Sequence, residues 1–283
     1  MFLFVLPALI CFAAIKLVPA VSGIFYSMTN WNGLNPHFRF IGFENFRTLF
    51  TNDSDFWKSM AFTLKYVIAA VVLMNFVALF LAILIENLTR GKGVFRTIFY
   101  MPNMISMIIG GFMWQFIFNQ VLYQLSQNPG LGFLDQPWTS NSNFAFVAIL
   151  VVATWGGAGY LMVIYIAAIQ GIPQTLNEAA VIDGAGSFQR FRHITIPMIR
   201  QAFTICFFVT LNNAFQVFDV VYSLTGGGPG RDTQVVAINI YEEAFARNNR
   251  FGYATAKSTI LFLVILVITF FQLRLMKNRE EEA

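Results

Sequence analysis

The chain has 283 residues, of which 57% are hydrophobic and only 11% are charged. Soluble domains carry about 25% charged residues, and the mean hydropathy of +0.63 also excludes an ordinary soluble fold. The net charge of +4 is too small to indicate a nucleic-acid-binding surface. We assign it to loops near anionic lipid, and we expect a bilayer to surround most of the chain.

Six segments are long and apolar enough to cross a bilayer as helices, which takes roughly 20 residues each. They are residues 2–28, 60–85, 97–118, 144–169, 202–222 and 256–275. No series of short alternating strands indicates a closed barrel. The fold class that we predict is therefore an all-α polytopic membrane protein, with residues 1–283 forming one transmembrane domain.

The first segment has to be distinguished from a cleaved signal peptide. No Lys or Arg precedes its apolar run, and the apolar character continues past Lys16 to Phe25. These features favour a retained first span, in which Lys16 faces the helix bundle or extends to the membrane surface.

Lys and Arg residues in the predicted loops indicate how the chain is oriented. If the N-terminus lies inside, the inside segments hold Arg90, Lys92, Arg96, Arg190, Arg192, Arg200, Arg274, Lys277 and Arg279. The outside segments then hold Arg39, Arg47, Lys58, Arg231, Arg247, Arg250 and Lys257. The inside charges are denser because their segments are shorter. We therefore predict that both termini are cytoplasmic.

No motif for chemistry is visible in the chain. The glycines at 226–230 lack the Lys-Ser/Thr pair of a nucleotide-binding loop, and residues 91–93 lack its spacing. Cys11 and Cys206 stand far apart in apolar runs, which favours free buried thiols over a disulfide. No catalytic set and no metal-ligand spacing is present, so we predict a protein that is not an enzyme and holds no cofactor or metal. If this membrane protein carries out active transport, the ATP must be hydrolysed by another chain, because this one lacks a nucleotide-binding loop.

The loop at 171–200, between the fourth and fifth spans, has the strongest local pattern. Pro173 blocks continuation of the fourth span as a helix. Thr175 and Glu178 have the spacing of a capping box. We therefore expect a short helix over residues 176–183, far too short to cross a membrane.

Glycines and caps define the rest of this loop. Gly184 and Gly186 are expected to end the first short helix. Ser187 is expected to cap a second short helix through residues 188–193, and Pro197 is expected in the first turn of span five. The loop is thus predicted to be two short helices joined by a tight turn.

The first short helix has a small apolar face, formed by Leu176, Ala179, Ala180 and Ile182. Such a face suits docking into a groove on a partner protein. The alternative is a turn that folds back on its own helix bundle, and local physical chemistry does not choose between the two.

The runs Glu178-Ala179-Ala180, Asp183-Gly184-Ala185 and Ile194-Thr195-Ile196-Pro197 resemble the EAA loop of type I ABC importer permeases. In that family the loop is a coupling helix that docks into a cleft on the ATPase subunit. The resemblance implies that Glu178 contacts the ATPase, a role compatible with capping, and that Gly184 allows the close turn. The docking residues that it implies are Glu178, Ala179, Ala180, Asp183, Gly184 and Ala185.

The resemblance extends along nearly the whole chain. Residues 40–46, 224–229 and 251–254 are similar to segments of the carbohydrate-uptake branch of the family, which includes the maltose and glycerol-phosphate permeases. This resemblance implies the six-span permease fold, a place in the bacterial or archaeal cytoplasmic membrane, and cytoplasmic N- and C-termini.

The same resemblance implies a set of partners. A second permease subunit would complete the pore as a heterodimer, and two ABC ATPase subunits would bind the ATP and Mg. An extracytoplasmic solute-binding protein would deliver the sugar. We expect no nucleic-acid partner.

Span five carries four polar residues, Asn212, Asn213, Gln216 and Asp219. Three of them follow i, i+4, i+7 spacing, which predicts a single helix face. Amide and carboxylate groups beside aromatic rings are typical of sugar sites, so we predict that these four residues line the substrate pathway. The alternative is that they bridge packed helices through hydrogen bonds.

Span four supplies two more candidates for the substrate pathway, Gly157 and Tyr160. By the resemblance, they fall where the maltose-type permease has sugar-site residues. Close helix packing is the alternative that we favour for the glycines of this span. Ala153 and Ala214 stand where that relative has Asn, which argues against maltose itself.

A further helix is expected outside the membrane over residues 233–246, with Glu242, Glu243 and Arg247 near its end. It would either contact the solute-binding protein or serve as a solvated connector.

The function that we predict is carbohydrate import by alternating access, with this chain as the membrane subunit of an ATP-driven importer. An importer of glycerol phosphate or another polyol is one alternative, but the spans offer only the poorly placed Lys16 and Lys65 to a phosphate. A non-transporting receptor or scaffold is another, and it would not depend on Glu178 or Gly184. A proton-coupled carrier would need a carboxylate in mid-span, whereas Asp219 lies near the outer end.

Overall fold

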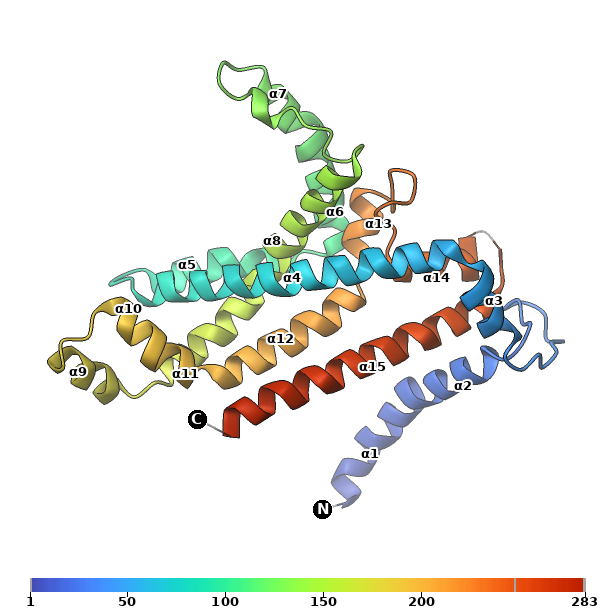
Figure 1. The fold of residues 1–283 in the computed structure, drawn as a ribbon, viewed down its shortest axis with the longest axis horizontal. Coiled ribbons are helices and arrows are strands. Elements are labelled where there is room, and N and C mark those ends of the chain that lie inside the picture. Colours follow the sequence, from blue (N-terminus) through green and yellow to red (C-terminus); the bar gives the residue numbers. More distant parts are fainter. Residues whose placement is uncertain (1, 247, 282–283) are drawn as a thin grey trace. The chain divides into compact units, whose positions relative to one another are not determined.

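The computed structural model describes residues 2–246 and 248–281 (Figure 1). Arg247 and the side chains of Lys277 and Arg279, which the orientation prediction counts, lie outside this described part. Within it the chain is helical, and the bridge between Thr29 and Phe40 is the one β pairing. Contacts divide the chain into two compact units. Unit 1 comprises residues 1–61 and 235–266, and unit 2 comprises residues 62–234 and 267–283.

Four helices are long and apolar enough to cross a membrane. They are Val5–Tyr26, Ser54–Glu86, Ser142–Gln170 and Phe251–Met276, which match the first, second, fourth and sixth predicted spans. Two bent helix pairs meet the same criterion when each pair is taken together. The described residues therefore hold four candidate spans, or six if each bent pair is one span.

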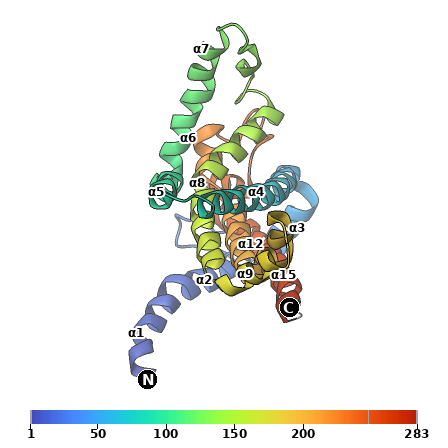
Figure 2. The ribbon, with the colours of Figure 1, turned by 90° about the vertical axis from the view of Figure 1, so that its left-hand side faces the viewer.

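The third predicted span is not one straight helix. α5 (Lys92–Tyr100) continues as the 3-10 turn η2 (Met101–Met104) and then meets α6 (Met107–Phe116) at a bend of 96°. Figure 2 shows α6 rising away from α5. Pro102 lies in the turn and Ile105 is extended, with ψ of 132°. Because proline lacks an N–H and an extended residue cannot continue a helix, the chain turns a corner there.

The fifth predicted span is broken as well. The segment Ser187–Met198 meets α12 (Arg200–Phe215) at a bend of 67°. It consists of α10 (Ser187–Arg190), the π-helical turn η5 (Phe191–Thr195) and α11 (Ile196–Met198). Pro197 therefore lies before the bend, and the prediction that it begins span five is wrong. The helix is broken again after Phe215, and α13 begins only at Asp219.

Unit 1 consists mainly of helices from both ends of the chain. It contains α1 (Phe2–Phe12), η1 (Ala13–Leu17), α2 (Val18–Tyr26), α3 (Glu44–Asn52), the start of α4 (Ser54–Glu86), α14 (Val236–Tyr241), η6 (Glu242–Ala246) and the first part of α15 (Phe251–Glu281). The α15 backbone comes so close to the segment after α2 that a Cβ at Gly252 would lie 2.2 Å from the Thr29 carbonyl oxygen. The buried Asn45 amide donates to the carbonyl oxygens of Ser27 and Thr29, at 2.8 and 2.9 Å. The segment that follows α2 is thereby fixed to α3 and α15.

A buried ionic cluster stabilises the same unit, and we name it the Lys257 cluster. The Lys257 side chain is 2% exposed, and its Nζ lies 2.8 Å from a carboxylate oxygen of Asp53 and 2.8 Å from one of Glu243. Lys257 also donates to Asn239, Tyr253 donates to Asp53, and Arg250 pairs with Glu243.

The Lys257 cluster corrects two predictions about the outer part of the chain. The predicted helix at 233–246 is α14 followed by the π-helical η6. Glu243 is 6% exposed and points into the cluster, so it is not a surface group for a binding protein. Lys257 was counted as a loop charge but is a buried ion-pair partner.

Unit 2 is built around α4, α8 (Ser142–Gln170) and α12. It also holds α5, η2, α6, η3 (Ile117–Val121), α7 (Leu122–Ser126), η4 (Gly132–Leu134), α9 (Gln174–Ile182), α10, η5, α11 and α13 (Asp219–Leu224). Its buried core joins Ala82 and Ile85 of α4 to Met162 of α8 and Cys206 of α12. Cys206 is a buried free thiol as predicted, whereas the free thiol of Cys11 in unit 1 is exposed.

Hydrogen bonds cross the core of unit 2. The Tyr165 hydroxyl donates to Asn75 at 2.8 Å, and the Asn75 amide donates to the Thr210 hydroxyl at 3.2 Å. This chain joins α8, α4 and α12. Hydrogen bonds between packed helices were the alternative role for the polar residues of span five. In the structure Tyr165, Asn75 and Thr210 form such bonds instead.

Two glycines of α8 serve close packing, as we favoured for this span. A Cβ at Gly159 would lie 2.1 Å from the Phe99 carbonyl oxygen, and one at Gly156 would lie 2.0 Å from the Met107 side chain. Any larger residue at Gly159 would push α5 away from α8, because the contact is with backbone.

Candidate functional site

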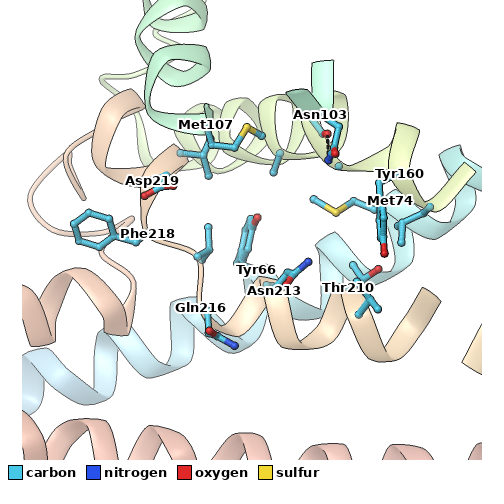
Figure 3. A pocket seen from close by; sticks show the side chains of 18 of the residues that line it. Tyr66, Met74, Asn103, Met107, Tyr160, Thr210, Asn213, Gln216, Phe218 and Asp219 are labelled. Atoms are coloured by element: carbon cyan, nitrogen blue, oxygen red, sulfur yellow. Dashed lines mark hydrogen bonds between the residues drawn. The ribbon is translucent and has the colours of Figure 1, made fainter. Parts of the chain in front are cut away.

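Unit 2 contains a cavity of about 390 Å³ between α4, the corner at η2, α8 and the break after α12 (Figure 3). Figure 3 shows Asp219 and Met107 toward one end and Tyr160 and Asn103 toward the other. The volume lies in the range of small-molecule sites.

Both breaks in the predicted spans contribute to this cavity. Gln216 has left helical geometry, with φ of −95° and ψ of 11°, and Phe218 has φ of −135°. Ile105 at the corner of the third predicted span lines the same space. Non-helical backbone at membrane depth is tolerated where it lines a cavity, so the two breaks and the cavity explain one another.

The polar side chains of the cavity are open to a ligand. Within the described part of the chain, the side chains of Asn213, Asp219 and Tyr160 have no hydrogen-bond partner, and all three are exposed. Asn103 donates to the Gly156 carbonyl oxygen at 3.2 Å, which holds its amide at the cavity wall. The lining thus offers amide, hydroxyl and carboxylate groups beside aromatic rings.

Five of the six predicted pathway residues line the cavity: Gly157, Tyr160, Asn213, Gln216 and Asp219. Asn212 is not among the lining residues, and its amide donates to the Phe208 carbonyl oxygen at 2.9 Å. The prediction that Asn212, Gln216 and Asp219 share one helix face is wrong, because α12 ends at Phe215. The break brings Asp219 and Asn213 to the cavity instead.

Tyr66 is a lining residue that the sequence analysis missed. It is 2% exposed, and Figure 3 shows its hydroxyl directed into the cavity. Asn103 and Thr210 were also missed. A polar residue in an otherwise apolar span was the available signal for Tyr66, but nothing in the sequence indicated which face of α4 it occupies.

The second candidate site is the loop at 171–200, and its first helix is α9 (Gln174–Ile182). Gly184 follows with φ of +77°. Its N–H donates to the Val181 carbonyl oxygen at 3.1 Å, and the Ala185 N–H donates to that of Ala180 at 2.9 Å. These two bonds form a Schellman motif, which confirms Gly184 as the residue that ends the helix.

The predicted caps are different in the structure. α9 begins two residues earlier than expected, so Thr175 lies inside it and forms no capping box. Glu178 instead accepts a hydrogen bond from the Gln174 amide at 2.8 Å. In α10 the N-cap is Gly186, not Ser187, and the Gly186 N–H donates to the Gln189 side chain at 2.8 Å. Helix ends commonly lie one or two residues from their expected position.

The loop does not fold back on the helix bundle. α9 has no buried residue, and Ile182 is 86% exposed at its end. Phe188, at the start of the next helix, is 72% exposed. Figure 1 shows α9 and α10 at one extremity of unit 2, beyond α11. The large exposed apolar groups are typical of a surface that a partner covers.

Residues 74–280 match the family model described as "Binding-protein-dependent transport system inner membrane component". The chain belongs to this family. The match includes both candidate sites, apart from Tyr66. The permease is thus a membrane component of a transport system and does not belong to an enzyme family.

Curated relatives resemble the permease over almost its whole length. It is 43% identical to the "Probable starch degradation products transport system permease protein AmyD" of Thermoanaerobacterium thermosulfurigenes, covering 99% of this chain and 94% of that protein. It is 32% identical to the "Multiple sugar-binding transport system permease protein MsmF" of Streptococcus mutans, covering 93% and 90%. It is 30% identical to the "sn-glycerol-3-phosphate transport system permease protein UgpA" of Rhizobium meliloti, covering 98% and 94%.

A solved structure shares the fold of the permease. A chain of a bacterial ABC transporter involved in the import of the acidic polysaccharide alginate matches with a TM-score of 0.83 and 23% identity, covering 98% of the permease and 94% of that chain. An amino acid ABC transporter matches with a TM-score of 0.55 and 18% identity, covering 84% and 98%. These likenesses show a fold that ABC transporters of unlike solutes share.

Proposed function

We propose that the permease is the transmembrane subunit of an ATP-driven importer that carries a neutral carbohydrate. The observation that carries the proposal is the cavity of unit 2, where the free groups of Tyr160, Asn213 and Asp219 surround a space of about 390 Å³. Amides and carboxylates bind sugar hydroxyls, and aromatic rings cover the apolar face of a sugar. The names of AmyD and MsmF, which describe permeases for starch degradation products and for multiple sugars, agree with this substrate class.

A phosphate or an acidic sugar fits the cavity less well. The described residues that line the cavity include Asp219, which carries a carboxylate, but no Lys or Arg. Anionic ligands are usually bound by Arg, Lys or helix N-termini. This lining favours a neutral solute, although one relative is a glycerol-3-phosphate permease and one structural neighbour belongs to an alginate importer.

The loop at 171–200 is the proposed connection to the source of energy. The exposed helix α9 would dock into a groove of an ABC ATPase subunit, with Glu178, Ala179, Ala180, Asp183, Gly184 and Ala185 in or beside the contact. Ile182 would supply the largest apolar contact, since it is the most exposed large apolar residue of the loop. ATP and Mg would be bound by that partner.

The complete importer would contain a second permease subunit, two ATPase subunits and an extracytoplasmic solute-binding protein. Both termini and the loop at 171–200 would lie in the cytoplasm. ATP binding would draw the docked loops of the two permease subunits together, and this motion would expose the cavity to the outside. Hydrolysis would return the cavity to the inside, which is alternating access.

The substrate proposal is tested with two neighbouring amides. Asn213→Ala removes a free amide from the cavity, whereas Asn212→Ala removes one that is bonded to the backbone of its own helix. Reconstituted complexes should take up neutral oligosaccharides with an apparent KM at least about fivefold higher for Asn213→Ala, a loss near the net value of one hydrogen bond. Asn212→Ala should be unchanged. Equal kinetics for the two variants would contradict the assignment of the cavity.

The docking proposal is tested with two exposed apolar residues. Ile182→Asp places a charge on the proposed contact, and Phe133→Asp makes the same kind of change at η4, where Phe133 is 68% exposed. Purification in mild detergent should recover the ATPase subunits with the wild type and Phe133→Asp but not with Ile182→Asp. Normal recovery with Ile182→Asp, or uptake that survives ATP depletion, would refute ATP-driven import through this loop.

A further inference from the structure

Glu86, the last residue of α4, joins three segments of unit 2. One of its carboxylate oxygens accepts hydrogen bonds from Arg96 of α5 and, at 3.2 Å, from the Gln170 amide. The other accepts from Lys92 at 3.1 Å, and Lys92 also donates to the Glu86 carbonyl oxygen at 2.6 Å. We name these four residues the Glu86 cluster. The Glu86 side chain is only 14% exposed, whereas its cationic partners Lys92 and Arg96 are partly exposed.

The Gln170 contact lies at one root of the loop at 171–200. Gln170 is the last residue of α8, and α9 begins at Gln174. Pro173 is the N-cap of α9 and lies in extended geometry, with φ of −56° and ψ of 127°. The linker between α8 and α9 is therefore short and contains a conformationally restricted residue, Pro173. A displacement of α9 would thus also move Gln170.

The other root of the loop shares a buried core with the same end of α4. Ile199, at the 67° bend before α12, is 1% exposed and belongs to the buried cluster that contains Ile85 and Ile166. Ile85 directly precedes Glu86. The last two residues of α4 thus bond to one root of the loop through Glu86 and share a buried core with the other root through Ile85.

We propose that Glu86 is a positioning residue for energy coupling, which fixes the root of the loop at Gln170 to α4 and α5. α4 carries Tyr66 and Met74 into the cavity, and η2 after α5 carries Asn103 there. A movement of the docked loop would pass through Glu86 to both of these walls of the cavity. The inference rests on the proposed function, because it concerns the step between ATP hydrolysis and solute movement.

The partly exposed cations make this contact suitable for a moving joint. Lys92 and Arg96 are 37% and 32% exposed, so water can solvate them while Glu86 changes partners. A fully buried ion pair would resist such rearrangement, because separation leaves unpaired charges in a low dielectric.

Two substitutions break the contact from opposite sides. Glu86→Gln keeps the shape of the side chain but removes its charge, and Gln170→Leu removes only the bond to the root of the loop. Gln136→Leu is the matched control, because the Gln136 amide donates to the Phe133 carbonyl oxygen and Gln136 is not a member of the Glu86 cluster. The readout is the number of ATP molecules hydrolysed per solute molecule imported by the reconstituted complex, together with recovery of the ATPase subunits.

The inference predicts that Glu86→Gln and Gln170→Leu raise this ATP-to-solute ratio at least threefold while the ATPase subunits remain bound. The double variant should be no worse than Gln170→Leu alone, and Gln136→Leu should keep the wild-type ratio. A wild-type ratio in Gln170→Leu would overturn the inference even if Glu86→Gln failed to assemble. Absence of ATP-dependent uptake in the wild type would instead refute the proposed function, so the two failures are distinguishable.

Discussion

The permease contains two ionic clusters whose carboxylates are similarly buried but whose lysines differ in exposure. The Asp53 carboxylate of the Lys257 cluster and the Glu86 carboxylate of the Glu86 cluster are each 14% exposed. Lys257, however, is 2% exposed, whereas Lys92 and Arg96 are 37% and 32% exposed. Arg250 of the Lys257 cluster is 54% exposed, so the depth of the central cation Lys257 is what distinguishes a cluster that stabilises the fold from one that can open.

This difference has a physical basis. A buried charge without its partner keeps most of its desolvation penalty, so the Lys257 cluster holds together or the region unfolds. A partly exposed pair can exchange its protein contacts for water at a small cost. The Lys257 cluster joins the C-cap of α3 to η6 and α15 in unit 1, and the Glu86 cluster lies beside the loop that we propose to move.

The largest effect expected from this comparison is that of Lys257→Met. The substitution leaves the carboxylates of Asp53 and Glu243 without the ammonium group that lies 2.8 Å from each. The free energy of unfolding should fall by about 3–5 kcal/mol, as for other buried ion pairs that lose one partner. Denaturant unfolding in detergent measures it, and exposed Lys58→Met in the same unit is the control. A loss below about 1 kcal/mol would show that the cluster is no more stabilising than a surface pair.

Acid should weaken the Lys257 cluster next. Burial would raise the pKa of Asp53, but hydrogen bonds from Lys257, the Phe56 N–H and Tyr253 lower this pKa below its ordinary value of 3.8. Burial would likewise raise the pKa of Glu243, but hydrogen bonds from Lys257, Arg250 and Asn248 lower this pKa below its ordinary value of 4.5. Because both pKa values are depressed in the folded state, their stabilisation is present above the ordinary pKa and is lost as pH falls through the folded value.

The measurement for this second prediction is the unfolding temperature as a function of pH. We expect a plateau at neutral pH and a decline that begins below about pH 4. Lys257→Met should show a shallower decline, because its carboxylates no longer have the lysine that lowers their pKa values. A decline of equal steepness in the variant would assign the acid sensitivity to other groups.

Glu86→Gln should change stability much less. The cations of the Glu86 cluster are partly solvated, so the free energy of unfolding should change by no more than about 1 kcal/mol. The same denaturant experiment measures it, beside Lys257→Met. A loss as large as that of Lys257→Met would erase the distinction between the two clusters and make Glu86 a structural residue.

Salt should produce the smallest effect and should act on one cluster alone. Raising the ionic strength from 0.1 to 1 M shortens the Debye length from about 10 to about 3 Å. The stability difference between the wild type and Glu86→Gln should therefore shrink, while that between the wild type and Lys257→Met stays constant. Shrinkage of both differences by the same factor would mean that Lys257 is reached by solvent ions.

Residues near one another in sequence made parts of the fold predictable. Four apolar runs became long helices because hydropathy over 20 residues is a local property. Gly184 ended α9 as expected, because a Schellman motif needs a residue that tolerates positive φ. The predicted capping box at Thr175 failed because α9 begins at Gln174, so that Thr175 already lies inside the helix.

The candidate site shows where local reasoning stops. Asn212 and Asn213 are adjacent and chemically identical, yet only Asn213 lines the cavity. Only Asn213 reaches the cavity because α12 ends at Phe215. Tyr66 of α4 and Tyr160 of α8 also lie on the side that Asn213 faces. A continuous helix would have selected Asn212 by its spacing to Gln216, and the sequence contains no signal for the break.

By itself the sequence determined the helical membrane class, the family and a short loop helix with its glycine stop, because these depend on composition and on short motifs. Only the tertiary structure decided the bends at Ile105 and Ile199, the break after Phe215 and the pairing of Asp53 with Lys257. The free energies of those features come from contacts between residues far apart in the chain. Hydropathy and spacing report what each segment can do alone, and the cavity and both ionic clusters exist only where several segments meet.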